Sequence, residues 1–307
     1  MHPAYSVIFF TTAAGAGYGL LFTLVLVATL VAVPLPPALL LSGLALAGLL
    51  VTAGLLSSTL HLGHPERAWR AFSQWRSSWL SREGVLAVMV YPVACAWAWL
   101  VWRAAGRSLT FDLLSLLLAV LAALTVYATG QIYASLKAVP AWHRASVPTN
   151  YLLLALMSGA QLLQALQLGF LDQPATSAVL VPVSIVLAAL GKAWYWWQID
   201  RAPPPSTLGS ATGLGAFGTV SVLAQPQTEE NYLQREMGFV LARKHAWKLR
   251  VLAVLGLFGM PLLAYLAGGL GWTVVGVLSM AVGLFIERWL FFAQAKHRVM
   301  LFYGGRL

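Results

Sequence analysis

Two residues whose side chains can carry protons, His61 and Glu83, bracket a polar segment between two apolar runs. A histidine ring donates or accepts a hydrogen bond and titrates near neutrality, and a nearby carboxylate can pass protons to or from it. An ionisable side chain at the edge of a lipid-buried segment is costly unless it is paired or functional. An imidazole and a carboxylate beside an apolar slot suit a quinone carbonyl, which takes up a proton during reduction. The alternative is structural: His61 caps a helix, and Glu83 pairs with Arg82 or Arg67.

The composition places most of the chain in lipid. Of 307 residues, 60% are hydrophobic and 9% are charged, whereas an ordinary soluble domain carries roughly 25% charged residues. The mean hydropathy of +0.78 agrees. These values exclude a soluble enzyme, a disordered chain and a nucleic-acid-binding protein.

Eight apolar runs are long enough to cross a bilayer, whose core of ~30 Å takes about 20 residues of helix. Such long runs without polar alternation cannot be barrel strands, so each predicts a helix. We therefore expect residues 1–307 to form a single all-α integral membrane domain with eight transmembrane helices. The runs cover residues 5–33, 37–60, 84–102, 110–135, 150–170, 176–197, 249–268 and 271–294.

The cationic residues gather on one side of this arrangement. The connections 61–83, 136–149 and 198–248 follow even-numbered runs, so they share a side with both termini. With the C-terminal tail, and with Arg250 at the edge of the third connection, they carry fifteen Lys and Arg residues, against two on the opposite side, Arg103 and Arg107. Because cytoplasmic loops collect Lys and Arg, both termini are predicted to be cytoplasmic. The net charge of +10 therefore indicates topology and not a nucleic-acid partner.

A finer division of the domain is less constrained. Small residues allow helices to approach closely, and they favour two four-helix bundles, residues 1–135 and 150–294. The long cytoplasmic loop 198–248 ends in an amphipathic stretch, 229–248. That stretch lies in the membrane interface, docks a soluble partner, or simply leads into the seventh run. The glycines concerned in the bundles are Gly15, Gly17, Gly19 and Gly159.

The sequence offers no ligand set for a metal cofactor. A transmembrane haem needs axial ligands, usually histidines, inside the bilayer, and all six histidines fall at the ends of runs or in connections. A lone cysteine, Cys95, cannot hold an iron–sulfur cluster or a structural zinc. We expect no haem and no iron–sulfur cluster in this chain. Lys192 and Glu287, each near the end of a run, are expected to pair with each other or to meet lipid headgroups.

Three segments resemble the membrane anchor subunits of dimethyl sulfoxide reductase: MHPAYSVIFFTTAAGAGYGL, HLGHPERAWRAFSQWRSSWLSREG and IYASLKAVPAWH. The resemblance spans nearly the whole chain and includes the eight-helix plan. It implies an anchor in the bacterial inner membrane for a molybdopterin catalytic subunit and a four-cluster iron–sulfur subunit. It also implies electron exchange with membrane quinone or quinol, either ubiquinone or menaquinone. In the family a histidine of the HLG motif and a glutamate after the next loop serve the quinone, and they match His61 and Glu83; Arg67 and Arg82 are further candidates for quinone binding.

The family contains two kinds of complex. One reduces S- or N-oxides with quinol at the outer face; the other, sulfite dehydrogenase, is a cytoplasmic sulfite:quinone oxidoreductase. His61 lies on the basic side, where the partner's clusters must approach the quinone, and that side is predicted to be cytoplasmic. The charge asymmetry therefore favours sulfite oxidation with quinone reduction, and the quinol-oxidising dimethyl sulfoxide reductase anchor is the alternative. A transporter or a purely structural anchor are the rivals from other classes.

Overall fold

The computed structural model describes residues 4–30, 35–60, 62–103, 106–171, 177–203, 206–224, 229 and 245–303. Within these ranges every regular element is a helix, and eight spans are long and apolar enough to cross a membrane. The all-α fold with eight potential membrane spans is therefore confirmed.

Most spans are single helices, and the seventh is assembled from three consecutive elements. The spans are α1 Tyr5–Leu30, α2 Pro37–Thr59, α3 Trp79–Trp102, α4 Leu109–Ala134, α5 Ser146–Phe170, α6 Ser177–Arg201, then α10 Ala246–Val254 with the π-helical η3 Leu255–Gly259 and α11 Met260–Ala267, and finally α12 Gly269–Ala293. The shorter helices are η1 Pro65–Gln74, α7 Leu208–Thr212, η2 Leu214–Phe217 and η4 Arg298–Tyr303.

The third span begins earlier than the hydropathy predicts. It starts at Trp79 and not at residue 84, because the Ser78 hydroxyl accepts a hydrogen bond from the Ser81 N–H (3.5 Å) and caps the helix. Glu83 consequently lies inside α3, one turn from its start. The fifth span also begins earlier than the hydropathy predicts. Pro148, which falls in the predicted connection 136–149, lies in the first turn of α5, where a missing N–H is tolerated.

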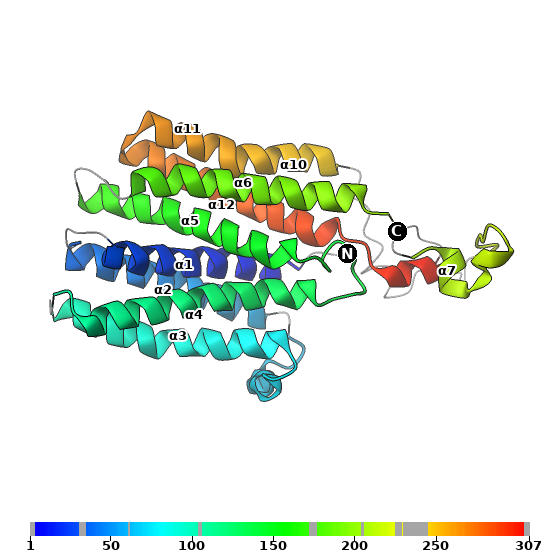
Figure 1. Ribbon diagram of the computed structural model, residues 1–307, viewed down its shortest axis with the longest axis horizontal. Helices are drawn as coiled ribbons and strands as arrows, with labels where there is room; N and C mark the ends of the chain where they lie inside the picture. The colour runs from blue at the N-terminus through cyan, green and yellow to red at the C-terminus, as the bar shows by residue number, and fades with distance from the viewer. Residues whose placement is uncertain are drawn as a thin grey trace.

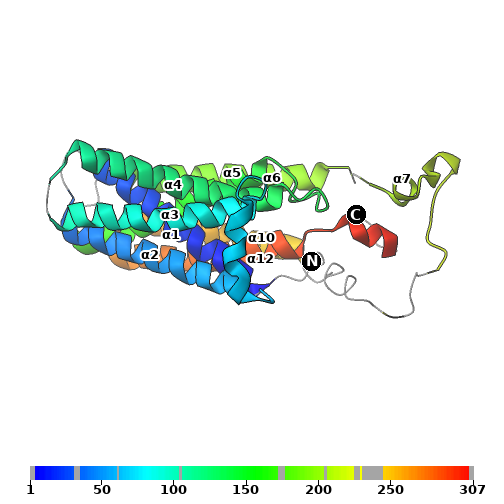
Figure 2. The same cartoon turned by 90° about the horizontal axis from the view of Figure 1, so that it is seen from below.

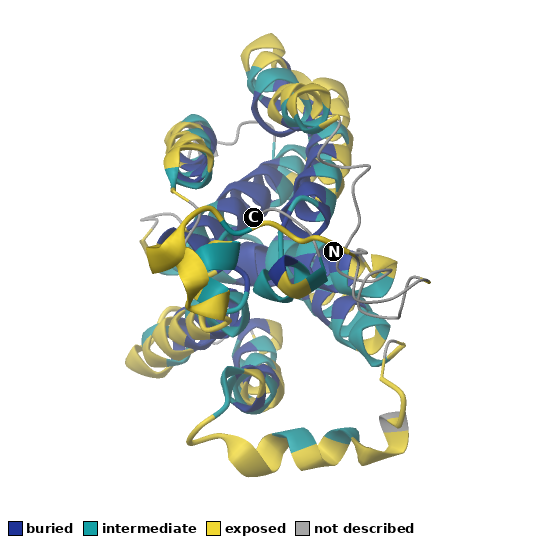
Figure 3. Ribbon diagram, turned by 90° about the vertical axis from the view of Figure 1, so that its right-hand side faces the viewer, coloured by how far each residue is buried: buried dark blue, intermediate teal, exposed yellow. Residues whose placement is uncertain are grey.

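Consecutive spans run antiparallel, so the beginning of α1 and the end of α12 lie at the same end of the bundle (Figure 1). We call the end that carries Tyr5, Ala134 and Ala293 the basic end. The connections before α3 and α5 lie there too, as do α7 and η4 (Figures 1 and 2). At this end η1 lies along one side of the bundle, beside the start of α3 and roughly perpendicular to the spans (Figures 1 and 3).

The helices α1 and α5 are the most buried spans, and they touch through glycines. A Cβ on Gly19 would lie 1.8 Å from the Ala155 carbonyl oxygen, and one on Gly159 would lie 2.1 Å from Gly19 backbone atoms. Gly17 meets α2 in the same way, whereas Gly15 has open space. The Gly19–Gly159 contact joins one helix from each proposed four-helix bundle, and the division at 1–135 and 150–294 stays a prediction.

The outward faces of the spans suit lipid. Large apolar side chains on α4 and α6 point away from the protein, such as Leu116 (62% exposed) and Leu190 (63% exposed). Figure 3 shows the buried residues gathered in the centre of the bundle and the exposed ones outside. Contiguous exposed apolar surface of this kind marks contact with a membrane or a partner, so the chain is a multi-pass membrane protein.

The long connection after α6 is described only in part. Its described residues include α7 and η2. The amphipathic stretch predicted over 229–248 falls mostly outside the described residues, apart from residue 229 and the start of α10. Its proposed docking or interfacial role stays open.

Candidate functional site

The carboxylate of Glu83 is buried at the basic end, between α3 and α4. Its residue is 4% exposed, and the Thr129 hydroxyl of α4 donates a hydrogen bond to it. The same hydroxyl lies 3.0 Å from the Thr125 carbonyl oxygen, so one proton serves two acceptors, of which a charged carboxylate would be the stronger. No ion pair among the described residues involves Glu83.

Polar and aromatic groups surround this carboxylate. Trp79 lies one turn before Glu83 on α3, and its ring packs edge-on against Tyr127 of α4 at 5.9 Å between centroids. Tyr18 of α1 lies within electrostatic range of Glu83. It is 2% exposed, and its hydroxyl has no hydrogen-bond partner in the described part of the chain. Because a buried hydroxyl without a partner is unfavourable, Tyr18 has capacity for a ligand oxygen.

His61, the predicted partner of Glu83, lies outside the described residues. Its neighbour Leu60 is the C-terminal cap of α2, and the Leu62 N–H donates to the Thr59 carbonyl at 3.1 Å. Both neighbours thus lie at the end of α2, which is the basic end of the bundle.

Arg82 and Arg67, the two cations proposed for quinone binding, make other contacts. The Arg82 guanidinium donates to the backbone carbonyls of Trp75 (3.0 Å) and Arg76 (2.6 Å). Arg67, on η1, is exposed and lies 3.7 Å from the Glu66 carboxylate. Glu83 is therefore not held in an ion pair with Arg82 or Arg67, which was the structural alternative for this carboxylate. A role of either arginine toward quinone stays a prediction.

The η1 segment is fixed to the start of α3, next to the Glu83 site. The Ser81 hydroxyl donates to the Ala71 carbonyl, and the two Arg82 hydrogen bonds hold the chain just after η1. The Phe72 ring packs over Gly84, where a Cβ would lie 3.1 Å from it. These contacts hold the connection that follows the HLG motif against the turn of α3 that contains Glu83.

A second buried cluster lies between α6 and α12. Lys192 and Arg288 both bind the Glu287 carboxylate, the arginine at 2.6 Å through its Nε. All three side chains are nearly inaccessible, and the Arg288 guanidinium also lies 4.0 Å from the centroid of the Tyr151 ring. The predicted pairing of Lys192 with Glu287 is confirmed. The third member, Arg288, was not among the predicted partners.

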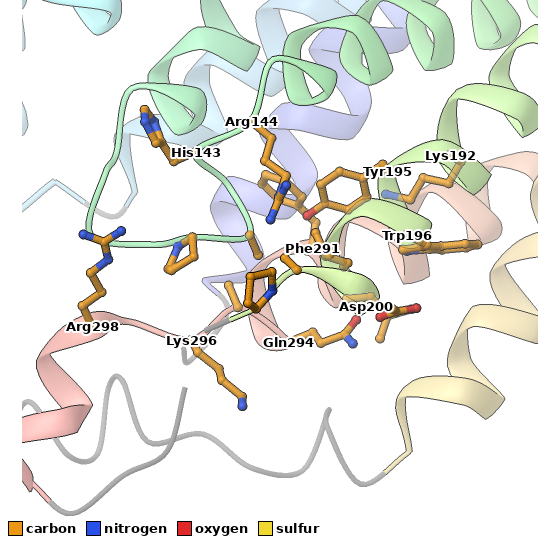
Figure 4. Close-up of a pocket in the computed structure, with 17 residues that line it drawn as sticks. His143, Arg144, Lys192, Tyr195, Trp196, Asp200, Phe291, Gln294, Lys296 and Arg298 are labelled. Atoms are coloured by element: carbon orange, nitrogen blue, oxygen red, sulfur yellow. The ribbon is translucent and has the colours of Figure 1, made fainter. Parts of the chain in front are cut away.

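A cavity of about 580 Å³ opens at the basic end beside this cluster (Figure 4). Its walls come from the α4–α5 connection, from α6 and from the end of α12. Glu83 is not among its lining residues, so the cavity and the Glu83 site are separate places. The lining residues labelled in Figure 4 are His143, Arg144, Lys192, Tyr195, Trp196, Asp200, Phe291, Gln294, Lys296 and Arg298.

Metal ligation has no support in this geometry. Across the residues that the structure describes, no group of three or more His, Cys, Asp and Glu side chains is close enough to hold a metal ion. Cys95 is exposed on α3, in a position that faces outward from the bundle.

Comparison with known proteins covers nearly the full chain. The family model of the DMSO reductase anchor subunit (DmsC) matches residues 1–304. A sulfite dehydrogenase subunit from Allochromatium vinosum is 33% identical over 326 aligned positions, which include 99% of this chain and 99% of that protein. Both matches contain the Glu83 site and the cavity. The resemblance expected from the HLG segment and its neighbours is confirmed: this chain belongs to the DMSO reductase anchor subunit family.

Proposed function

We propose that this protein is the quinone-reactive membrane anchor of an oxidoreductase complex and exchanges protons with quinone through Glu83 and His61. The observation that carries the proposal is the state of Glu83: a carboxyl group buried at the membrane boundary, with one hydroxyl donor and no cation among the described residues. Such a group can take up or release a proton without breaking an ion pair. Burial of an ionisable group at this depth is unfavourable unless the group is paired or functional.

In this proposal Glu83 transfers the proton, and the residues around it orient the carboxylate and bind the quinone. Quinone reduction needs two electrons and two protons. In the proposed site Glu83 holds a proton at its carboxylate, and Thr129 orients that carboxylate through its hydrogen bond. The unpartnered Tyr18 hydroxyl is available to a carbonyl oxygen, and Trp79 and Tyr127 supply flat apolar surface. His61 would connect the site to water at the basic end.

The proposed partners dock at the basic end. An iron–sulfur subunit must bring its nearest cluster close to the quinone, and the loops at this end carry most of the cationic residues. A positively charged surface favours the encounter with an acidic partner. A molybdopterin catalytic subunit would bind the iron–sulfur subunit in turn, and lipid surrounds the spans in a bacterial inner membrane.

We favour sulfite oxidation with reduction of quinone as the overall reaction. The basic end faces the cytoplasm if the positive-inside rule holds, and the relative from Allochromatium vinosum carries the name of a sulfite dehydrogenase subunit. The second candidate is the quinol-oxidising anchor of an S- or N-oxide reductase. The two differ in a direct assay of the whole complex, with sulfite and quinone or with quinol and dimethyl sulfoxide. Turnover only with quinol and the S-oxide would contradict the favoured direction.

The site itself is tested by Glu83→Gln, which keeps the shape and removes the exchangeable carboxyl proton. In the complex with its partner subunits, quinone turnover should fall about 10²–10⁴-fold, the usual contribution of a positioned acid or base. Dye-linked activity of the catalytic subunit and assembly of the complex should stay unchanged. Glu66→Gln removes an exposed carboxylate of η1 and serves as the matched control.

Two outcomes would contradict the proposal. If Glu83→Gln and His61→Asn leave quinone turnover at the level of Glu66→Gln, the residues have no part in proton exchange. If both variants lose assembly and dye-linked activity together with quinone turnover, the residues serve the structure, as in a purely structural anchor. Transport of a solute by the chain without partner subunits would favour the transporter.

A further inference from the structure

The cavity beside α6 and α12 carries an excess of positive charge. Four cationic side chains line it, Arg144, Lys192, Lys296 and Arg298, and among the described residues the one carboxylate on its wall is Asp200. That carboxylate is already neutralised, because Arg250 of α10 binds it through two hydrogen bonds of 2.6 Å and 2.9 Å. Lys192 also has an anionic partner, Glu287, which it shares with Arg288.

The two arginines that line the cavity, Arg144 and Arg298, have no anionic partner among the described residues. The Nε atoms of Arg144 and Arg298 are buried and have no hydrogen-bond partner in the described part of the chain. None of the ion pairs found there includes either residue. Arg298 is held in place by its backbone N–H, which donates to the Ala138 carbonyl at 2.9 Å. A partly desolvated guanidinium without an acceptor is unfavourable, so both side chains have capacity for an anionic ligand.

The other walls of the cavity are apolar and lie at the membrane boundary. Trp196 and Ile199 of α6 and Leu290 and Phe291 of α12 are among its lining residues. The same turns of α6 expose Trp194 and Trp197 (54% and 47%), and tryptophans concentrate at the headgroup level of a bilayer. Figure 4 shows Arg144, Lys192 and Tyr195 extending around one space that Phe291 and Trp196 also border.

We propose that this cavity binds the headgroup of an anionic phospholipid. The phosphate accepts hydrogen bonds from Arg144 and Arg298, and the glycerol and upper acyl chain lie against Trp196 and Ile199. Basic pockets between transmembrane helices are suited to anionic headgroups, and arginine matches the geometry of phosphate oxygens. This site is separate from Glu83 and does not depend on the function proposed above.

A lipid fits these walls better than an acidic segment of a partner protein. The cavity lies at the ends of α6 and α12, on the same turns of α6 as the exposed Trp194 and Trp197, where the headgroups of a bilayer lie. Its volume of about 580 Å³ lies within the range of small-molecule sites, and its apolar walls would leave a chain of peptide bonds without hydrogen-bond partners.

The test measures lipid binding by native mass spectrometry of the full chain in detergent. Phosphatidylglycerol and phosphatidylcholine with identical acyl chains are titrated separately, and inorganic phosphate is added as a competitor. Phosphatidylglycerol should bind at one site in preference to phosphatidylcholine. Arg144→Gln and Arg298→Gln should each weaken it about fivefold, and the double variant about 25-fold, since one cation near an anionic headgroup contributes on this scale. Arg144→Lys should restore part of the binding.

Arg201→Gln is the matched control, since Arg201 lies at the same end of α6, is exposed and packs on Trp197 outside the cavity. Thermal unfolding in detergent verifies that the variants fold. Equal binding of the two lipids, or an equal loss with Arg201→Gln, would overturn the proposal. Displacement of the lipid by inorganic phosphate at similar concentration would reduce the site to one for free phosphate. Release of a partner subunit by the double variant, with lipid binding intact, would assign the arginines to protein docking.

Discussion

The two buried carboxylates at the basic end, Glu83 and Glu287, differ in their hydrogen-bonding and ionic partners. Glu287 binds two cations, Lys192 and Arg288, whereas Glu83 accepts a hydrogen bond from the neutral Thr129. A carboxylate neutralised on both oxygens serves the structure, because loss of its charge would leave two cations buried. A carboxylate with only a hydroxyl donor can be protonated at a much lower free-energy cost. The partners, and not the burial, therefore separate a structural role from a chemical one.

This difference predicts unequal effects of two substitutions in the Lys192–Glu287–Arg288 cluster. Glu287→Gln leaves two uncompensated buried cations and should destabilise the chain by about 3–5 kcal/mol, as removal of one partner from a buried ion pair does. Lys192→Met removes one cation and leaves the neutral pair of Glu287 with Arg288, so its effect should be clearly smaller. Thermal unfolding of both variants in the same detergent measures the difference.

The expected order of melting temperatures is wild type, then Lys192→Met, then Glu287→Gln. Arg107→Gln removes a cation from an exposed pair with Asp112 (3.2 Å) and should change little, since exposed ion pairs contribute about 0–1 kcal/mol. If Lys192→Met were the more damaging of the two cluster variants, the neutral Glu287–Arg288 pair would not be stable by itself.

At this scale the sequence predicted individual residues better than their partners. Glu83, at the edge of an apolar run, and Lys192 and Glu287, inside runs, stand out because ionisable groups at these places are rare. Thr129 and Tyr18 do not, because a threonine in a span commonly bonds its own preceding turn, as Thr125 does with Leu121, and a tyrosine in the middle of a span, such as Tyr18 in α1, carries no charge that would single it out. Only the crossing of α3 and α4 makes Thr129 a partner of Glu83.

At the scale of elements, the crossing of α1 and α5 depends on glycine. The backbones approach so closely that no side-chain atom fits at Gly19 or Gly159. In lipid, where apolar burial gives helices little reason to associate, such close packing is a main source of stability.

Gly19→Ala should therefore destabilise the bundle, whereas Gly15→Ala should not. The added methyl at residue 19 would lie 1.8 Å from the Ala155 carbonyl oxygen, and overpacking of this kind typically costs about 1–3 kcal/mol. At residue 15 the methyl has open space, so the change should stay within about 1 kcal/mol, the difference in helix propensity. Unfolding temperatures in detergent and the yield of assembled complex report both effects. Equal effects of the two variants would mean that α1 and α5 are farther apart than described.

Span positions were predictable from hydropathy, and their ends were not. Hydropathy averages over about 20 residues, so it overlooks the polar cap at Ser78 and the tolerated Pro148 in the first turn of α5. It also gives no sign of the π-helical η3 in the seventh span. In this span Pro261 lacks an N–H. Gly256 packs closely against α12, because a Cβ added to it would lie 3.0 Å from the Gly283 Cα. These are local requirements of packing that periodicity does not contain.

For the whole molecule, the sidedness of charge links the two proposed sites. The Glu83 carboxylate, the lipid cavity and most of the Lys and Arg residues lie at the same end. If that end faces the cytoplasm, then proton exchange, anionic lipid and the docked partner share one face. If it faces outward, the same geometry fits the quinol-oxidising reductase arrangement. Topology is therefore the property that separates the two candidate reactions.

Single cysteines introduced into a Cys95→Ala background determine the topology. Ser73, exposed on η1, marks the basic end, and Thr110, exposed at the start of α4, marks the opposite end. Positive-inside orientation predicts that a membrane-impermeant maleimide labels Thr110→Cys in intact cells and labels Ser73→Cys only after the membrane is disrupted. Labelling of Ser73→Cys from outside would place the docking face and Glu83 on the outer side. It would contradict the sulfite direction while leaving the Glu83 test and the lipid test unaffected, because neither depends on which compartment the basic end faces.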